Sequence, residues 1–199
     1  MPADTTMESL GFVEGMEAGS EARGLSGPGG TKLFYGKYRA MVLENQDPEG
    51  RCRLLVNVVD VYGPNISTWA MPCLPYAGFQ MGAYIVPPPQ AGVWVEFEHG
   101  DPDYPIWTGC WWGIPDAPLT AKGVPPGTPV FMVSSVKQCS IAISDLPLPT
   151  LGLKQGGVVL SAGPQCYIAI EPTGVTIVAP TVDITGVLTV NKTALVVSL

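Results

Sequence analysis

The final 45 residues constrain this chain most strongly. Residues 155–199 contain nine valines, four isoleucines and six threonines, against three charged residues, Glu171, Asp183 and Lys192. β-Branched side chains at this density favour strands over helices. Apolar and polar residues alternate strictly in "TVDITGVLTVN", residues 181–191, which is the period of a strand with two different faces. The sequence therefore predicts short β-strands throughout this segment.

The alternation gathers the large apolar side chains on one face of these strands. So few short strands cannot close a core within one chain, and open strand edges would aggregate. Three copies wound around a shared axis would cover the apolar face and leave edges only at the two ends. We therefore expect a homotrimeric β-helix, with a β-hairpin module packed on the rest of the chain as the alternative. The expected axial residues are Ile168, Ile170, Val175, Ile177, Val182, Ile184, Leu188 and Val190.

Upstream, about five short apolar runs separated by Gly and Pro turns occupy residues 31–115. This number and spacing favour a small five-stranded barrel of the OB type. Residues 1–30 are acidic, Gly-rich and aperiodic, which predicts a flexible tail. Residues 116–155 are punctuated by Pro and Gly and offer one short strand, "SIAISDLPLP", so we expect a neck between the barrel and a spike formed by residues 156–199. The predicted fold class is all-β.

The aromatic residues concentrate in the barrel segment, above all in "GDPDYPIWTGCWWG", residues 100–113. Asp and Pro at its start predict a turn, and the Pro that follows begins a strand. Large aromatic side chains would fill a small barrel interior. We predict that five of them pack in or against the barrel: Trp94, Phe97, Trp107, Trp111 and Trp112.

The charge distribution argues against two other classes of function. The chain has 17 acidic and 10 basic residues, a net charge of −7, and no basic segment that could neutralise phosphates. Glu96, Glu98, Asp101 and Asp103 surround the aromatic stretch, so a nucleic-acid-binding OB domain is a weak alternative. Glu96 and Glu98 could form a glycosidase-like pair, or His99 could activate a thiol. No second constellation supports either reading, and we predict no catalytic, metal or cofactor site.

Cysteine usage and the N-terminus suggest where the chain folds. Its five cysteines are widely spaced and form no CxxC pair, which predicts buried thiols in a reducing compartment. The first 20 residues lack the basic and apolar regions of a signal peptide. We therefore expect folding in a bacterial cytoplasm, with any later export independent of a cleaved leader.

Several segments together carry a family resemblance. "YGKYRAMVLENQDPEGRCRL", "WAMPCLPYAG", "PPPQAGVWVEFEHGDPDYPIWTGCWWG" and "IAIEPTGVTIVAPTVDITGVLTVN" resemble the baseplate spike proteins of contractile injection systems, the phage-baseplate, VgrG-like family. The resemblance covers about residues 32–199. It implies an OB-fold domain followed by a triple-stranded β-helix, a structural role, and a trimer driven into the target-cell envelope when a sheath contracts. The large hub domain of type VI VgrG proteins is absent here, which implies a separate hub protein.

The C-terminal end departs from some family members. Some phage spikes hold an iron ion at the tip through a His-x-His pair, whereas this chain has a single histidine, His99. Without a metal cap, the apolar end formed by Leu195, Val196, Val197 and Leu199 needs another cover, and the resemblance implies a PAAR-type tip protein. The hub-less form is most like the spike of an extracellular, phage-tail-like injection system, whose particle is released or membrane-attached. The spike of a contractile-tailed phage is the alternative.

Overall fold

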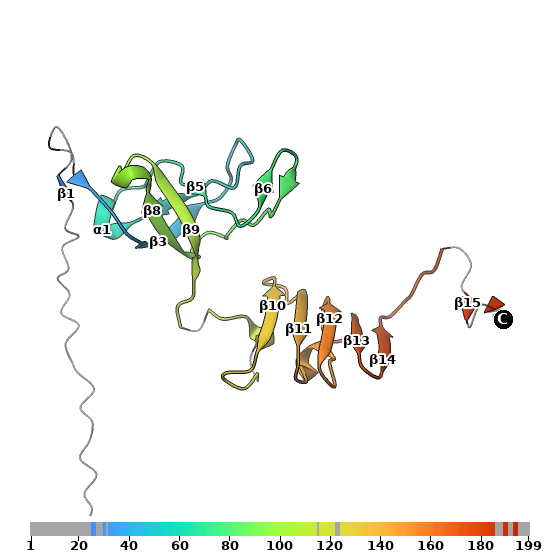
Figure 1. The fold of residues 1–199 in the computed structure, drawn as a ribbon. Coiled ribbons are helices and arrows are strands. Elements are labelled where there is room, and N and C mark those ends of the chain that lie inside the picture. Colours follow the sequence, from blue (N-terminus) through green and yellow to red (C-terminus); the bar gives the residue numbers. More distant parts are fainter. Residues whose placement is uncertain are drawn as a thin grey trace, which may run out of the picture. The chain divides into compact units, whose positions relative to one another are not determined.

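The chain folds into two compact units, Met1–Gly113 and Ile114–Leu199. A computed structural model describes residues 25–26, 30, 32–114, 116–121, 124–185, 189–190 and 193–194. Both units are built from short strands, and helix is confined to single turns (Figure 1). This agrees with the all-β prediction. No helix in the described part of the chain is both long and apolar enough to cross a bilayer.

The first unit is built on a five-stranded sheet with the strand order β4-β3-β8-β9-β5. All its neighbours are antiparallel except β5 and β9. The strands and single-turn helices of this unit are β1 Leu25–Ser26, β2 Lys32–Leu33, β3 Tyr38–Glu44, β4 Leu55–Asn57, α1 Val59–Tyr62, β5 Met71–Pro72, β6 Ala77–Gly78, β7 Met81–Gly82, β8 Gly92–Phe97, η1 Glu98–Gly100 and β9 Pro105–Trp111.

Two irregularities curl this sheet into a half-barrel. The register shifts between Val42 and Glu44 in the β3–β4 pair and between Trp94 and Val95 in the β8–β9 pair. Bulges of this kind bend a strand and increase its twist. Pro72 lies in the edge strand β5, where a missing N–H costs no ladder bond. The result is consistent with the predicted OB-like domain.

The concave side of the sheet holds the core of the first unit. Phe97 lies near its centre, with ring centroids 6.1 Å from Phe34, 5.5 Å from Tyr38 and 6.0 Å from Tyr62. The buried apolar residues are Phe34, Ala40, Val42, Cys52, Leu54, Val56, Val58, Ala70, Val93, Val95, Phe97 and Trp107.

A turn at residues 47–50 lies between β3 and β4. Gly50 N–H donates to the Asp47 carbonyl at 3.0 Å, and the Asp47 carboxylate accepts bonds from three backbone N–H groups. The Arg53 guanidinium donates to the same carboxylate at 2.6 Å and 3.0 Å. These bonds, led by the Arg53 contact, hold the pKa of Asp47 well below its usual range. The loop is thus anchored on one carboxylate.

The second unit is a five-stranded antiparallel meander, β10-β11-β12-β13-β14, in which each strand pairs with its neighbours in sequence. Its elements are η2 Leu119–Ala121, β10 Val130–Ser134, β11 Ser140–Ser144, η3 Pro149–Leu151, β12 Gly157–Ser161, β13 Tyr167–Glu171, β14 Gly174–Val178, β15 Thr189–Val190 and β16 Thr193–Ala194. Over residues 130–178 the structure shows this single-chain sheet and not the expected β-helix.

Two predicted boundaries differ from the structure. Residues 116–155, predicted to be a neck with one short strand, contain both β10 and β11 and supply two strands to the second sheet. Pro and Gly in this range form the turns between elements, and this punctuation resembles that of a linker. Within residues 1–30, predicted to be a tail, β1 pairs with β2, so that Leu25 lies opposite Leu33.

Candidate functional site: an uncovered sheet face

One face of the second sheet is covered by the chain itself. Small residues point to this side from the central strands, including Ala142 of β11 and Ala169 of β13, and both are fully buried. They leave room for the loop between β11 and β12, which is closed by mutual backbone bonds between Leu148 and Leu153. The core of this unit consists of Ala142, Leu148, Leu151, Leu153, Val159 and Ala169.

The covered face also holds its polar groups in hydrogen bonds. The Thr120 and Ser134 hydroxyls are 2.7 Å apart, and the Ser134 and Ser140 hydroxyls 2.6 Å apart. Glu171 accepts backbone bonds from Lys154 and Gln155 at 2.7 Å and 2.6 Å. Buried polar groups need such partners to be tolerated. This side of the sheet is therefore fully packed within one chain, and its polar groups are hydrogen-bonded.

The opposite face is entirely apolar at its strand positions. Strand pairing aligns its side chains in two rows, each with one residue from every strand. The first row is Val133, Ile141, Leu160, Ile168 and Ile177; the second is Phe131, Ile143, Val158, Ile170 and Val175. We call these residues the apolar face.

The apolar face is exposed in the single chain. Its exposed fractions run from 40% at Ile168 to 64% at Val175, and only Val158 falls in the intermediate class below this range. A soluble antiparallel sheet normally presents polar residues on the side that faces water. A contiguous apolar patch of this kind marks an interaction surface.

The size of the stabilisation available on this face can be estimated. Full burial of a Val, Leu, Ile or Phe side chain contributes about 1.5–3 kcal/mol, so covering the exposed half contributes roughly 1 kcal/mol per residue. Across both rows, the sum is on the order of 10 kcal/mol per copy before the cost of association. This gain is of the same order as the cost of association, which is about 4–15 kcal/mol.

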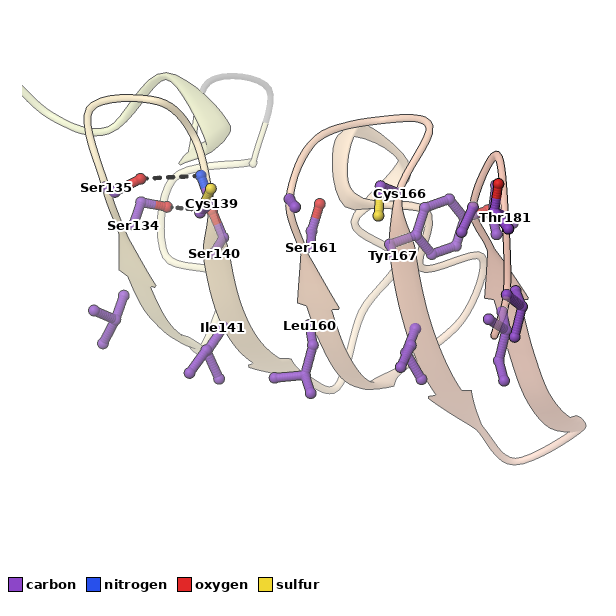
Figure 2. Close-up of a pocket in the computed structure, with 17 residues that line it drawn as sticks. Ser134, Ser135, Cys139, Ser140, Ile141, Leu160, Ser161, Cys166, Tyr167 and Thr181 are labelled. Carbon is purple, nitrogen blue, oxygen red and sulfur yellow. Dashed lines mark hydrogen bonds between the residues drawn. The ribbon is translucent and has the colours of Figure 1, made fainter. Parts of the chain in front are cut away.

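A groove follows the first row to one end of the strands. Its volume is about 750 Å³, and it is lined by first-row side chains together with the β10–β11 and β12–β13 turns. Figure 2 shows Cys139, Cys166 and Thr181 at this end, with Ile141 and Leu160 farther along the strands. Val182, beyond β14, lines the same groove and is 52% exposed.

Four of the predicted axial residues belong to this face, and a fifth, Val182, lines its groove. Ile168, Ile170, Val175 and Ile177 belong to the two rows. Val182 and Ile184 follow in extended chain and are 52% and 56% exposed. Val190 belongs to β15, whereas Leu188 lies outside the described residues. The four residues predicted to bind a tip protein, Leu195, Val196, Val197 and Leu199, also lie outside them.

The sequence analysis missed the upstream half of the apolar face. Phe131, Val133, Ile141 and Ile143 lie in the segment taken as a neck. A signal was present, because Ile141 and Ile143 alternate with Ser140, Ala142 and Ser144. The second of the two strands in this segment, β11, was predicted within "SIAISDLPLP" but assigned to the neck, and the first, β10, was not predicted. Val158 and Leu160 of β12 also belong to the face and were not among the predicted axial residues.

The aromatic residues of the first unit divide between its core and its outer surface. Phe97 and Trp107 are buried, and Trp107 Nε1 donates to the Cys52 carbonyl at 2.9 Å. The half-buried Trp94 and Trp111 flank the Arg39 guanidinium, which lies 5.5 Å and 5.2 Å from their rings. Trp112 is 68% exposed in the single chain, and its packing where the barrel meets the neck or a neighbouring subunit stays a prediction.

The thiols and carboxylates also depart in part from expectation. All five cysteines are free, but only Cys52 is buried, so the prediction of buried thiols is wrong for Cys73, Cys110, Cys139 and Cys166. Short loops and edge positions leave these four accessible. Glu96 forms an ion pair with Lys37 at 2.9 Å, as a surface carboxylate does. No cluster of three potential metal ligands occurs among the described residues.

The curled sheet of the first unit matches a known domain. Residues 38–112 match the type VI secretion system/phage-baseplate injector OB domain. The matched range begins at the first residue of β3 and ends one residue after β9, so it spans the main sheet. This match supports a baseplate spike-like family, and it supports a structural baseplate role for the first unit. The comparison with curated proteins gives no match.

Proposed function

We propose that this chain is the structural spike of a contractile injection system, assembled as a homotrimer through the apolar face. The observation that carries the proposal is the pair of complete apolar rows, left uncovered in a chain that also bears an injector OB domain. Each copy contributes one sheet as one side of a three-sided prism. The covered face, with its own loops, forms the outside.

The prism extends into the expected β-helix beyond the meander. From β10 to β14 the backbone bonds lie within one chain, so copies meet there by side-chain packing alone. Val182 and Ile184 continue the alternation after β14, and strands of different copies begin to wind around one another in this region. A triangular section is favoured because it buries three apolar faces around one axis without leaving a lateral edge.

The mechanical role follows from this architecture. Strands cross-linked by hydrogen bonds around a dry interior resist bending and compression. A separate hub protein holds the injector OB domain, and a PAAR-type tip protein covers the apolar C-terminal end. Sheath contraction drives the assembly through the target envelope. Of the possible systems, we propose an extracellular, phage-tail-like particle, with the spike of a contractile-tailed phage as the alternative.

Electron microscopy of particles from producing cells tests this function. Wild-type particles should show a threefold density at the baseplate centre that accommodates both units of the chain. The variant Leu160→Glu should lack this density, whereas Thr173→Glu, in the exposed β13–β14 turn, should retain it. A wild-type chain located at the baseplate periphery, or a central density that survives Leu160→Glu, would contradict the proposal.

A further inference from the structure

A second apolar surface projects from the first unit. The β6–β7 hairpin extends away from the curled sheet (Figure 1). We call residues 76–85 the arm. Its large side chains are exposed: Tyr76 55%, Phe79 89%, Met81 54%, Tyr84 73% and Ile85 54%. At aromatic areas of 150–250 Å² each, the arm presents on the order of 500 Å² of apolar surface. This is within the range of about 300–600 Å² for the largest apolar patch of a typical monomer, which is often functional.

The arm has a defined conformation. Ala77 pairs with Gly82 and Gly78 with Met81, and Ala83 N–H donates to the Tyr76 carbonyl at 2.9 Å. A side chain at position 82 would meet that carbonyl oxygen at 2.9 Å, so the close approach requires glycine. Gln80 adopts a φ of 56°, which is uncommon for a residue other than glycine. The chain thus holds Phe79 at the tip of a closed hairpin.

A cavity lies between the base of the arm and β9. Its volume is about 360 Å³, and its lining is mainly apolar, with Leu74, Pro75 and Ile85 on one side and Trp107 on the other. Cys73 and Cys110 also line it. A phenyl ring would fit with room to spare, since a cavity of about 150 Å³ accommodates benzene. Phe79 is not among the residues that line this cavity.

The whole arm and one side of the cavity belong to a stretch without any charge. Residues 61–95 contain no Asp, Glu, Lys, Arg or His, although the whole chain has a net charge of −7. Copies of an acidic chain repel one another across most of their surfaces. No residue of the arm or of the cavity lining is charged, although Lys37 Nζ donates to Thr108 Oγ1 in that lining at 2.8 Å. The arm can therefore meet the cavity of another copy without direct like-charge contact.

We propose that the arm of one copy inserts Phe79 into the cavity of the neighbouring copy. Knob and cavity lie on different parts of the same chain, so the contact is head-to-tail and closes when three copies complete a ring. About 500 Å² on each partner is less than a stable interface needs alone. The exchange therefore rests on the proposed trimer, in which the apolar face keeps the copies at high effective concentration.

Native thiols report on the two interfaces separately. Cys73 and Cys110 line the arm cavity, whereas Cys139 and Cys166 line the groove of the apolar face. All four are exposed in the single chain. Alkylation of the assembled full chain with a maleimide, followed by peptide mass spectrometry, should find Cys73 and Cys110 several-fold less reactive than in the Phe79→Ser variant. Cys139 and Cys166 should react equally in both proteins, because Phe79→Ser leaves the apolar face intact.

A cross-linking variant tests the contact between the arm and the cavity directly. In Phe79→Cys, oxidation of the assembly with diamide should join position 79 of one copy to Cys73 or Cys110 of the next. The control Gln46→Cys, at an exposed position of the β3–β4 connection, should give no such link. Absence of the link, with Cys73 and Cys110 fully reactive in an intact trimer, overturns arm exchange and leaves the spike proposal standing. A monomer in which all four thiols react freely overturns both.

Discussion

Ile141 of β11 and Leu160 of β12 lie directly opposite each other near the middle of the second sheet, yet their side chains are 50% and 48% exposed. Their sequence neighbours Ala142 and Val159, which face the other way, are fully buried. The chain therefore covers only one face of this sheet. This relationship separates the residues needed for folding of one chain from those through which we propose that copies assemble, and the two groups can be mutated independently.

The apolar face should be required for assembly and dispensable for folding. Leu160→Glu places a carboxylate in the dry interior of the oligomer in every copy, and each unpaired buried charge costs several kcal/mol. We expect the variant to elute as a monomer in size-exclusion chromatography while its circular dichroism remains that of a folded β-protein. Thr173→Glu is the matched control and should assemble normally. A Leu160→Glu protein that still assembles would show that this face is not the interface.

The covered face should show the opposite behaviour. Leu151 belongs to the loop between β11 and β12, is 1% exposed and packs against the covered face of the sheet. Leu151→Ala removes buried methyl groups and leaves a cavity, which should lower the free energy of unfolding by about 2–5 kcal/mol. Leu146→Ala, at a position 45% exposed, should cost far less. Urea unfolding of both variants checks this, and equal losses would refute the assignment of the loop to the core.

The close contact of Gly92 with Trp111 should be sensitive to a single methyl group. A Cβ at position 92 would lie 2.6 Å from the Trp111 ring, whose Nε1 donates to the Val93 carbonyl at 3.1 Å. Gly92→Ala should displace this ring and destabilise the first unit by about 1–3 kcal/mol, as overpacking does. A shift in tryptophan fluorescence should accompany the change, and an unchanged spectrum and stability would count against it.

Acid should weaken the loop held by Asp47. Folding lowers the pKa of this carboxyl because Arg53 and backbone N–H groups bind the charged form. Its contribution is therefore present above the unfolded-state pKa of about 3.9 and is lost as pH falls through the lower folded-state value. Asp47→Asn should be less stable than wild type at pH 7, and the difference should shrink below about pH 4. Thermal unfolding across this pH range measures it, with exposed Asp60→Asn as control; a constant gap refutes the pairing.

Local patterns predicted the first unit well. Short strands separated by Gly and Pro turns were predicted from residue chemistry, and the turn at residues 47–50 is one of these turns. The tryptophans were harder, because bulk alone does not tell core from surface. Trp94 of β8 and Trp107 of β9 lie on opposite faces of the sheet, because Trp107 pairs with Val95 and not with Trp94. The bulge between Trp94 and Val95 shifts the register at this point, which the sequence alone does not show.

In the second unit, the alternation identified the apolar face but not its extent. Ile168 and Ile177 could be assigned to one face because their segments alternate over several residues. Val133 and Ile141 could not, since the length of the sheet depends on pairing between segments separated by loops. The arm also escaped prediction, because exposure of Phe79 is a property of the folded hairpin and not of its sequence neighbours.

The mass of the purified full chain in solution tests directly whether the apolar face joins three copies. If the apolar face joins three copies, multi-angle light scattering at micromolar concentration should give about three times the chain mass of 21.0 kDa. A uniform species at 21.0 kDa, with the apolar face stably exposed to water, would contradict assembly of a trimer through this face.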